Sequence, residues 1–97
     1  LKIGKGYDHC FVLNKNSSIA AELSSEASGR KLIISTNQPG IQFYSGNHLS
    51  GFFNKNQGLC LETQHFPDSP NNDNFPTTKL IANEEYYSET IYFFDVI

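Results

Sequence analysis

The sequence predicts an all-β fold of antiparallel strands arranged as a β-sandwich. Short runs rich in β-branched and aromatic residues recur along the 97 residues, and clusters of Gly, Pro, Asn and Asp separate them. No segment repeats apolar residues at helical spacing for more than one turn. Short strands at regular spacing, with turn signals between them, are typical of β-sandwiches.

The turns between the expected strands have specific signals. Asn14-Lys15-Asn16 ends the first strand, and the runs on either side of Ala27-Ser28-Gly29 are expected to form a β-hairpin. At Pro39-Gly40 we expect a turn in which proline fixes φ and glycine adopts the positive φ that follows. Pro67 ends the strand that begins near Gly58.

Alternation of side chains predicts which residues share a face. In the run 41–45, Ile41 and Phe43 are expected to face a core, and Gln42 and Tyr44 to point to the opposite side. The last run alternates in the same way and is expected to close a sheet, with one side made of Thr90, Tyr92 and Phe94 and the other of Ile91, Phe93 and Asp95. The expected strands are 7–13, 19–24, 30–36, 41–45, a run from 58 that ends before Pro67, 77–81 and 89–96, with loops at 1–6 and 46–58 and irregular structure at 68–74.

The composition excludes several classes of function. The net charge is −3 and the basic residues are scattered, so no nucleic-acid partner is expected. No segment is long and apolar enough to span a membrane, and none is expected to bind one. Many neutral amide and hydroxyl side chains accompany eight Phe and five Tyr, a mixture that suits a neutral polyhydroxy ligand better than a charged one.

The two cysteines, Cys10 and Cys60, have no zinc-motif spacing, and no two histidines are spaced as metal ligands, so no metal site is expected. The thiols are either free, as in the reducing cytoplasm where we expect the protein to be, or paired in a secreted protein. The free form is favoured. His9 is expected to point away from Asp8 as a loosely packed or satisfied side chain, and His48 to lie in a loop. His65, three residues after Glu62, is close enough to line the same pocket but is more simply explained as a solvated loop residue.

Three polar side chains, Asp8, Gln42 and Glu62, lie on runs that otherwise look like strands. Alternation puts Cys10 on the face of Asp8 and Cys60 on the face of Glu62. An unpaired buried carboxylate costs roughly several kcal/mol, so Glu62 is either a half-exposed surface residue or a site residue on a rigid support. Composition alone favours the surface residue for both carboxylates.

Longer motifs resemble those of the aldose 1-epimerase (galactose mutarotase) family. The resemblance rests on Gly6–Leu13, Gln38–Asn47 and Leu61–Asp68 followed by Asn74-Phe75-Pro76, with Ala27-Ser28-Gly29-Arg30 also fitting. The family's fold is a large antiparallel β-supersandwich, considerably longer than this chain. The resemblance therefore implies that residues 1–97 form the C-terminal portion of a single domain, and that a longer polypeptide or a second chain supplies the N-terminal portion.

The resemblance also implies the chemistry. Members interconvert the α and β anomers of galactose, glucose and related aldoses without a cofactor. Glu62 matches the general base that takes the proton of the C1 hydroxyl, Asp8 matches a carboxylate that hydrogen-bonds sugar hydroxyls, and Gln42 matches a site glutamine. The histidine that acts as the acid lies in the family before the part that matches Leu1, so the chain alone is expected to be inactive and poorly folded.

Two other interpretations stay open on the residues alone. The chain could belong to a non-catalytic carbohydrate-binding β-module, in which Glu62 only accepts hydrogen bonds from a sugar. It could instead be a structural fragment that adds strands to the sheet of a partner. Replacing Glu62 with glutamine distinguishes a binding module from an enzyme. An enzyme should lose turnover and keep its sugar affinity, whereas a binding module has no turnover to lose.

Overall fold

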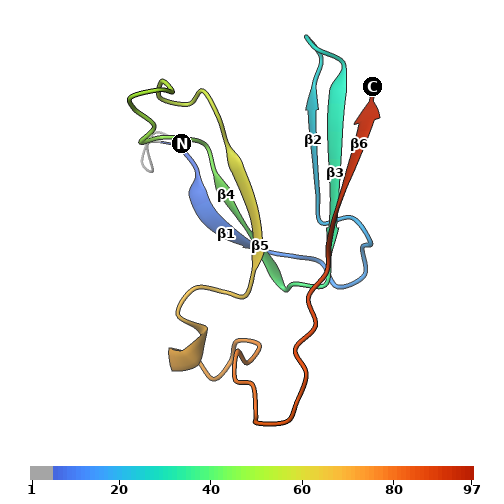
Figure 1. Cartoon of the computed structure of the whole chain (residues 1–97), viewed down its shortest axis with the longest axis vertical. Helices are drawn as coiled ribbons and strands as arrows, with labels where there is room; N and C mark the ends of the chain where they lie inside the picture. Colours follow the sequence, from blue (N-terminus) through green and yellow to red (C-terminus); the bar gives the residue numbers. More distant parts are fainter. Residues whose placement is uncertain (1–5) are drawn as a thin grey trace.

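The computed structural model describes residues 6–97 and contains two antiparallel three-stranded sheets (Figure 1). The first sheet has the order β1-β4-β5, with β1 at Asp8–Val12, β4 at Gly40–Tyr44 and β5 at Cys60–Gln64. The second has the order β2-β3-β6, with β2 at Ala21–Ser25, β3 at Arg30–Thr36 and β6 at Thr90–Val96. The all-β, antiparallel prediction is confirmed. Apart from Gly6, the loop expected at 1–6 lies outside the described residues.

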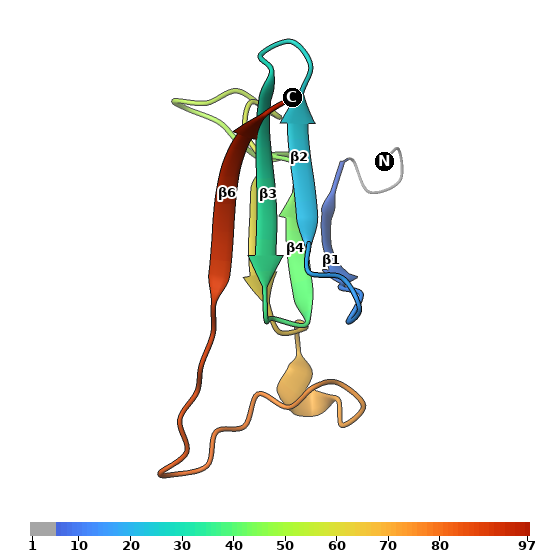
Figure 2. The same cartoon turned by 90° about the vertical axis from the view of Figure 1, so that its right-hand side faces the viewer.

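The two sheets form two layers that converge at one end and separate toward the other (Figures 1 and 2). A chain of hydroxyl groups joins the layers where they converge: Thr63 on β5 is 2.8 Å from Thr90 on β6, and Thr90 is 3.0 Å from Thr36 on β3. Near this end the buried apolar side chains are Ile34, fully buried on β3, and Ile41, 4% exposed on β4. The small core therefore lies between the sheets.

The second sheet carries the predicted hairpin and the predicted closing strand. β2 and β3 pair in antiparallel register around Gly29, whose φ is +73°. β6 pairs with β3 so that Tyr92 lies opposite Ile34 and Phe94 opposite Leu32. Although these side chains alternate as expected, Phe94 is 77% exposed and Val96 is 73% exposed. Much of the apolar surface of this sheet is thus uncovered by residues 6–97.

The prediction of a strand at 77–81 is wrong. The segment is extended but exposed, and no other strand pairs with it. Its β-branched Thr77 instead accepts a hydrogen bond from the backbone N–H of Lys79 through its hydroxyl, at 3.1 Å. Local side-chain bonds of this kind compete with sheet formation, and an isolated strand has no partner for its own backbone groups.

Two turn predictions also need correction. Gly40 does not adopt a positive φ but begins β4, since the positive-φ glycines among residues 6–97 are Gly6, Gly29, Gly46 and Gly51. The segment 68–74 is not wholly irregular, because Ser69–Asn71 form one turn of 3₁₀-helix, η1, with Pro70 in its first turn. Proline fixes φ near the helical value, which explains why so polar a run turns regularly there. None of the helical structure in the described part is long and apolar enough to cross a membrane.

Candidate active site

The strand register of the first sheet places nine residues in a three-by-three grid on one face. Residues directly opposite each other on paired strands point to the same side, and so do alternate residues along one strand. We call this side the grid face. Its rows are Asp8–Tyr44–Cys60, Cys10–Gln42–Glu62 and Val12–Gly40–Gln64, each in the order β1, β4, β5.

The three site candidates from the sequence share this face. Gln42 lies at the centre, half-buried, and its Nε2 donates a hydrogen bond of 2.9 Å to Oδ1 of Asp8. Glu62 lies directly opposite Gln42 on β5 and is exposed. Its carboxylate accepts no hydrogen bond and forms no salt bridge with residues 6–97. Both of its oxygens are therefore free to accept bonds from a ligand.

The two carboxylates lie on a diagonal of the grid. Asp8 and Glu62 are separated by two strand spacings and by two residues along the strand. With strands ~4.8 Å apart and a rise of ~3.4 Å per residue, their Cα atoms are about 12 Å apart. A small molecule that reaches both carboxylates must therefore lie over Gln42 and Tyr44.

Hydrogen bonds from the following loop fix the Asp8 end of the grid face. The hydroxyl of Tyr44 accepts a bond of 2.9 Å from the backbone N–H of His48. Asn47, 9% exposed, donates from Nδ2 to the carbonyl of Tyr7 at 2.8 Å. Its Oδ1 accepts bonds from the Ser45 hydroxyl at 2.7 Å and from Asn56 Nδ2 at 3.1 Å. The long polar loop is thus attached at both of its ends beside Asp8.

Both cysteines lie on the grid face, as alternation predicted, and both are free thiols. Cys10 and Cys60 occupy the same kind of diagonal as the carboxylates, which places their Cα atoms about 12 Å apart, beyond the reach of a disulfide. Burial raises the pKa of the Cys10 thiol, and a hydrogen bond from Gln64 Nε2, at 3.9 Å, partly offsets the rise. Cys60 is exposed.

The described histidines do not belong to the grid face. His9 points to the opposite side of β1, where its ring contacts Tyr7 edge-on at 6.0 Å between centroids, and its Nδ1 accepts the backbone N–H of Asp8. The ring of His65 lies 6.4 Å from that of Tyr86. In the part of the chain that the structure describes, no three His, Cys, Asp or Glu side chains come together as metal ligands. None of the nine residues of the grid face is thus a histidine.

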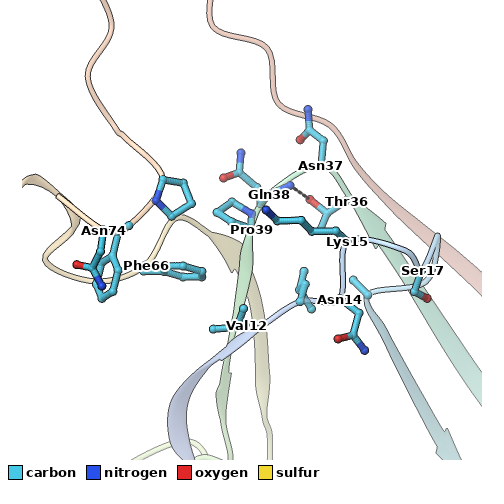
Figure 3. A pocket seen from close by; sticks show the side chains of 14 residues that line it. Val12, Asn14, Lys15, Ser17, Thr36, Asn37, Gln38, Pro39, Phe66 and Asn74 are labelled. Carbon is cyan, nitrogen blue, oxygen red and sulfur yellow. Dashed lines mark hydrogen bonds between the residues drawn. The ribbon is translucent and has the colours of Figure 1, made fainter. Parts of the chain in front are cut away.

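Neither Tyr44 nor Phe66 was predicted from the sequence as a site residue. Tyr44 belongs to the grid face, where it lies between Asp8 and Cys60, and its alternation with Gln42 was the available signal. Phe66 lies two residues after β5, and no local pattern indicates that its ring packs over Gly40. Phe66 also lines a cavity of about 750 Å³ (Figure 3), whose lining includes Val12 of the third row but none of Asp8, Gln42 and Glu62.

Comparison with known proteins identifies the family. The profile of the family described as aldose 1-epimerase matches residues 1–93. Galactose mutarotase from Mus musculus is 44% identical over 101 residues, covering 94% of this chain and 30% of that protein. Galactose mutarotase from Homo sapiens is 42% identical with the same coverage.

A bacterial relative gives the same result. The aldose 1-epimerase from Escherichia coli (strain K12) is 39% identical over 102 residues, covering 93% of this chain and 30% of that protein. The chain therefore spans about 30% of the length of the curated relatives that it matches. Because the family profile covers nearly the whole sequence, the chain belongs to the aldose 1-epimerase family.

Proposed function

We propose that this chain is the C-terminal part of an aldose 1-epimerase that interconverts the α and β anomers of galactose- and glucose-type aldoses. One observation carries the proposal. Asp8, Gln42 and Glu62 come from three motifs far apart in the sequence, and the strand register gathers them on one face. That face offers carboxylates and an amide, which are suitable partners for sugar hydroxyls.

Glu62 is the general base. Its carboxylate takes the proton of the C1 hydroxyl, and the electron pair of that O–H bond forms the C1 carbonyl. The bond between C1 and the ring oxygen breaks, and the ring oxygen receives a proton from an acid. Rotation about C1–C2 and reclosure by the reverse steps then give the other anomer. The free oxygens of Glu62 and its place on a strand support this role.

Asp8 and Gln42 hold the sugar. The bond from Gln42 Nε2 occupies Oδ1 of Asp8 and orients the carboxylate, which leaves Oδ2 to accept a sugar hydroxyl. Gln42 keeps its Oε1 and a second N–H for the same purpose. A sugar bound between Asp8 and Glu62 is thereby positioned with its anomeric hydroxyl at the base, and no cofactor is needed for the proton transfers.

The acid and most of the sandwich come from the N-terminal portion of the family's fold, in which a histidine protonates the ring oxygen. The uncovered apolar side chains of β6, among them Phe94 at 77% exposure, support a covering portion of this kind. The isolated chain is accordingly inactive and poorly folded. We place the enzyme in the cytoplasm, where the free thiols of Cys10 and Cys60 persist.

The test uses the assembled enzyme, meaning this chain completed by the N-terminal portion of the fold, as one polypeptide or by co-expression. Polarimetry of freshly dissolved α-galactose should show that Glu62→Gln lowers kcat by about 10²–10⁴-fold, the contribution of a positioned general base, while galactose binding changes little. Glu26→Gln, in the exposed hairpin turn, is the matched control and should keep full activity.

The outcomes separate the alternatives. Sugar binding without turnover in the unsubstituted assembled enzyme would make the chain part of a carbohydrate-binding module. Full activity of Glu62→Gln would show that the base lies elsewhere. Mutarotation by the isolated chain well above the buffer rate would contradict the need for an N-terminal portion.

A further inference from the structure

The ring of Phe66 packs on the grid face at its third row. A Cβ built on Gly40 would lie 3.0 Å from Cδ1 and Cε1 of Phe66 and 3.0 Å from Sγ of Cys10. Gly40 and Gln42 are alternate residues of β4, so this contact is on the side where Gln42 points. Phe66 therefore fills the space that the absent side chain of Gly40 leaves, next to Cys10 and one row beyond Gln42.

The segment around Phe66 holds the ring in place. Phe75 contacts it edge-on, with ring centroids 5.3 Å apart and planes at 85°. The hydroxyl of Ser69, which is 6% exposed, donates to the Phe66 carbonyl. Asp68, at φ 62°, is fixed in turn by Asn72, whose Nδ2 donates to the Asp68 carbonyl at 2.7 Å. The ring thus stands on a turn with many internal bonds.

The ring also lines a cavity, and Val12 of the third row lines the same cavity. It measures about 750 Å³, and in Figure 3 the Phe66 ring lies between Asn74 and Pro39 at its edge. Its size falls within the range of roughly 300–1,000 Å³ that is usual for small-molecule sites. The polar lining consists of amides and hydroxyls with one ammonium group: Asn14, Asn37, Gln38, Asn74, Ser17, Thr36 and Lys15. These groups match the hydroxyls of a second sugar unit.

We propose that Phe66 is a specificity-determining residue, which closes the sugar-binding face at the position of Gly40 and narrows its access to this cavity. The inference rests on the proposed function. Of the three rows, the first two hold Asp8, Gln42 and Glu62, and a single pyranose covers them. A substituent that extends the sugar past Gln42 toward Gly40 meets the Phe66 ring. With the ring removed, the open face extends by one row, about 7 Å, and opens more widely into the cavity.

The test compares reducing sugars of two sizes with the assembled enzyme. For galactose, lactose and melibiose, kcat/KM is measured by polarimetry in the unsubstituted enzyme and in Phe66→Ala. The reducing unit of both disaccharides is glucose, so glucose is measured as well and serves as the reference; it carries the second sugar on O4 in lactose and on O6 in melibiose. For at least one disaccharide, Phe66→Ala should raise kcat/KM relative to that for glucose by about tenfold or more, the usual scale for relieving a steric clash in a pocket.

Two further variants keep the result decisive. Phe52→Ala removes a phenylalanine that is 97% exposed in the 46–58 loop and should leave all ratios unchanged. If Phe66→Ala does not fold, Phe66→Leu retains an apolar contact with Phe75. The ratio of kcat/KM values should then change in the same direction but by a smaller factor. Unchanged ratios in a folded Phe66 variant that still turns over galactose would overturn this inference. Absence of galactose turnover in the unsubstituted assembled enzyme would instead overturn the proposed function.

Discussion

Replacing Gly40 with alanine introduces one methyl group at the most crowded point of the grid face. The backbone of Gly40 does not need glycine, because its φ is not positive. Alanine also loses less conformational freedom than glycine within a strand, which favours the variant by about 0.5–1 kcal/mol. Any destabilisation must therefore come from contacts of the new methyl group.

Those contacts are tight. The added Cβ would lie 3.0 Å from two carbons of Phe66 and from Sγ of Cys10, and Phe75 prevents the ring from moving freely. Overpacking by one methyl group typically costs about 1–3 kcal/mol. Subtracting the gain in the backbone, we expect Gly40→Ala to lower the free energy of unfolding of the assembled enzyme by up to about 2.5 kcal/mol.

Urea titration of four proteins measures this effect: the unsubstituted assembled enzyme, Gly40→Ala, Phe66→Ala and the double variant. Once the ring is absent, only the contact of the new methyl group with Sγ of Cys10 remains, so Gly40→Ala should cost less in the Phe66→Ala background. The coupling energy between the two substitutions should be about 1–2 kcal/mol, as for residues in direct contact. Stabilisation by Gly40→Ala alone, or additive effects of the two substitutions, would refute the packing of Phe66 on Gly40.

Two other features give independent predictions. Asn47→Ala removes three hydrogen bonds that attach the 46–58 loop, so it should lower the free energy of unfolding of the assembled enzyme, measured in urea, by about 2–4 kcal/mol. Asn54 is exposed, and Asn54→Ala should change this free energy little. Equal effects of the two substitutions would contradict the role of Asn47 in attaching the loop. Because burial raises the pKa of Cys10, a smaller fraction of this thiol is ionised at pH 8. Iodoacetamide should therefore label the exposed Cys60 first, as measured by peptide mapping, and saturating galactose should slow the labelling of Cys60. Faster labelling of Cys10 would contradict its lower exposure and raised pKa.

Most of the fold was predictable because its signals are local. The hairpin around Gly29 follows from two β-rich runs and a glycine that adopts a positive φ. The alternation in β4 and β6 correctly gave the faces of Gln42 and Tyr92. The failure at 77–81 has the opposite cause. Strand propensity says nothing about whether a partner strand is within reach, and Thr77 satisfies a backbone N–H by itself.

The candidate site was only partly predictable, because its meaning depends on register between strands far apart in sequence. Alternation along β5 predicted the face on which Glu62 lies. It did not predict that Gln42 lies opposite Glu62 on the neighbouring strand, or that Gln42 orients Asp8 through a hydrogen bond. Gly40 shows the same limit more sharply. Next to proline it has the local pattern of a turn, yet its absent side chain makes room for Phe66, a residue 26 positions further along. A glycine that serves local backbone geometry and one that admits a distant ring look alike in sequence, and only the assembled sheet distinguishes them.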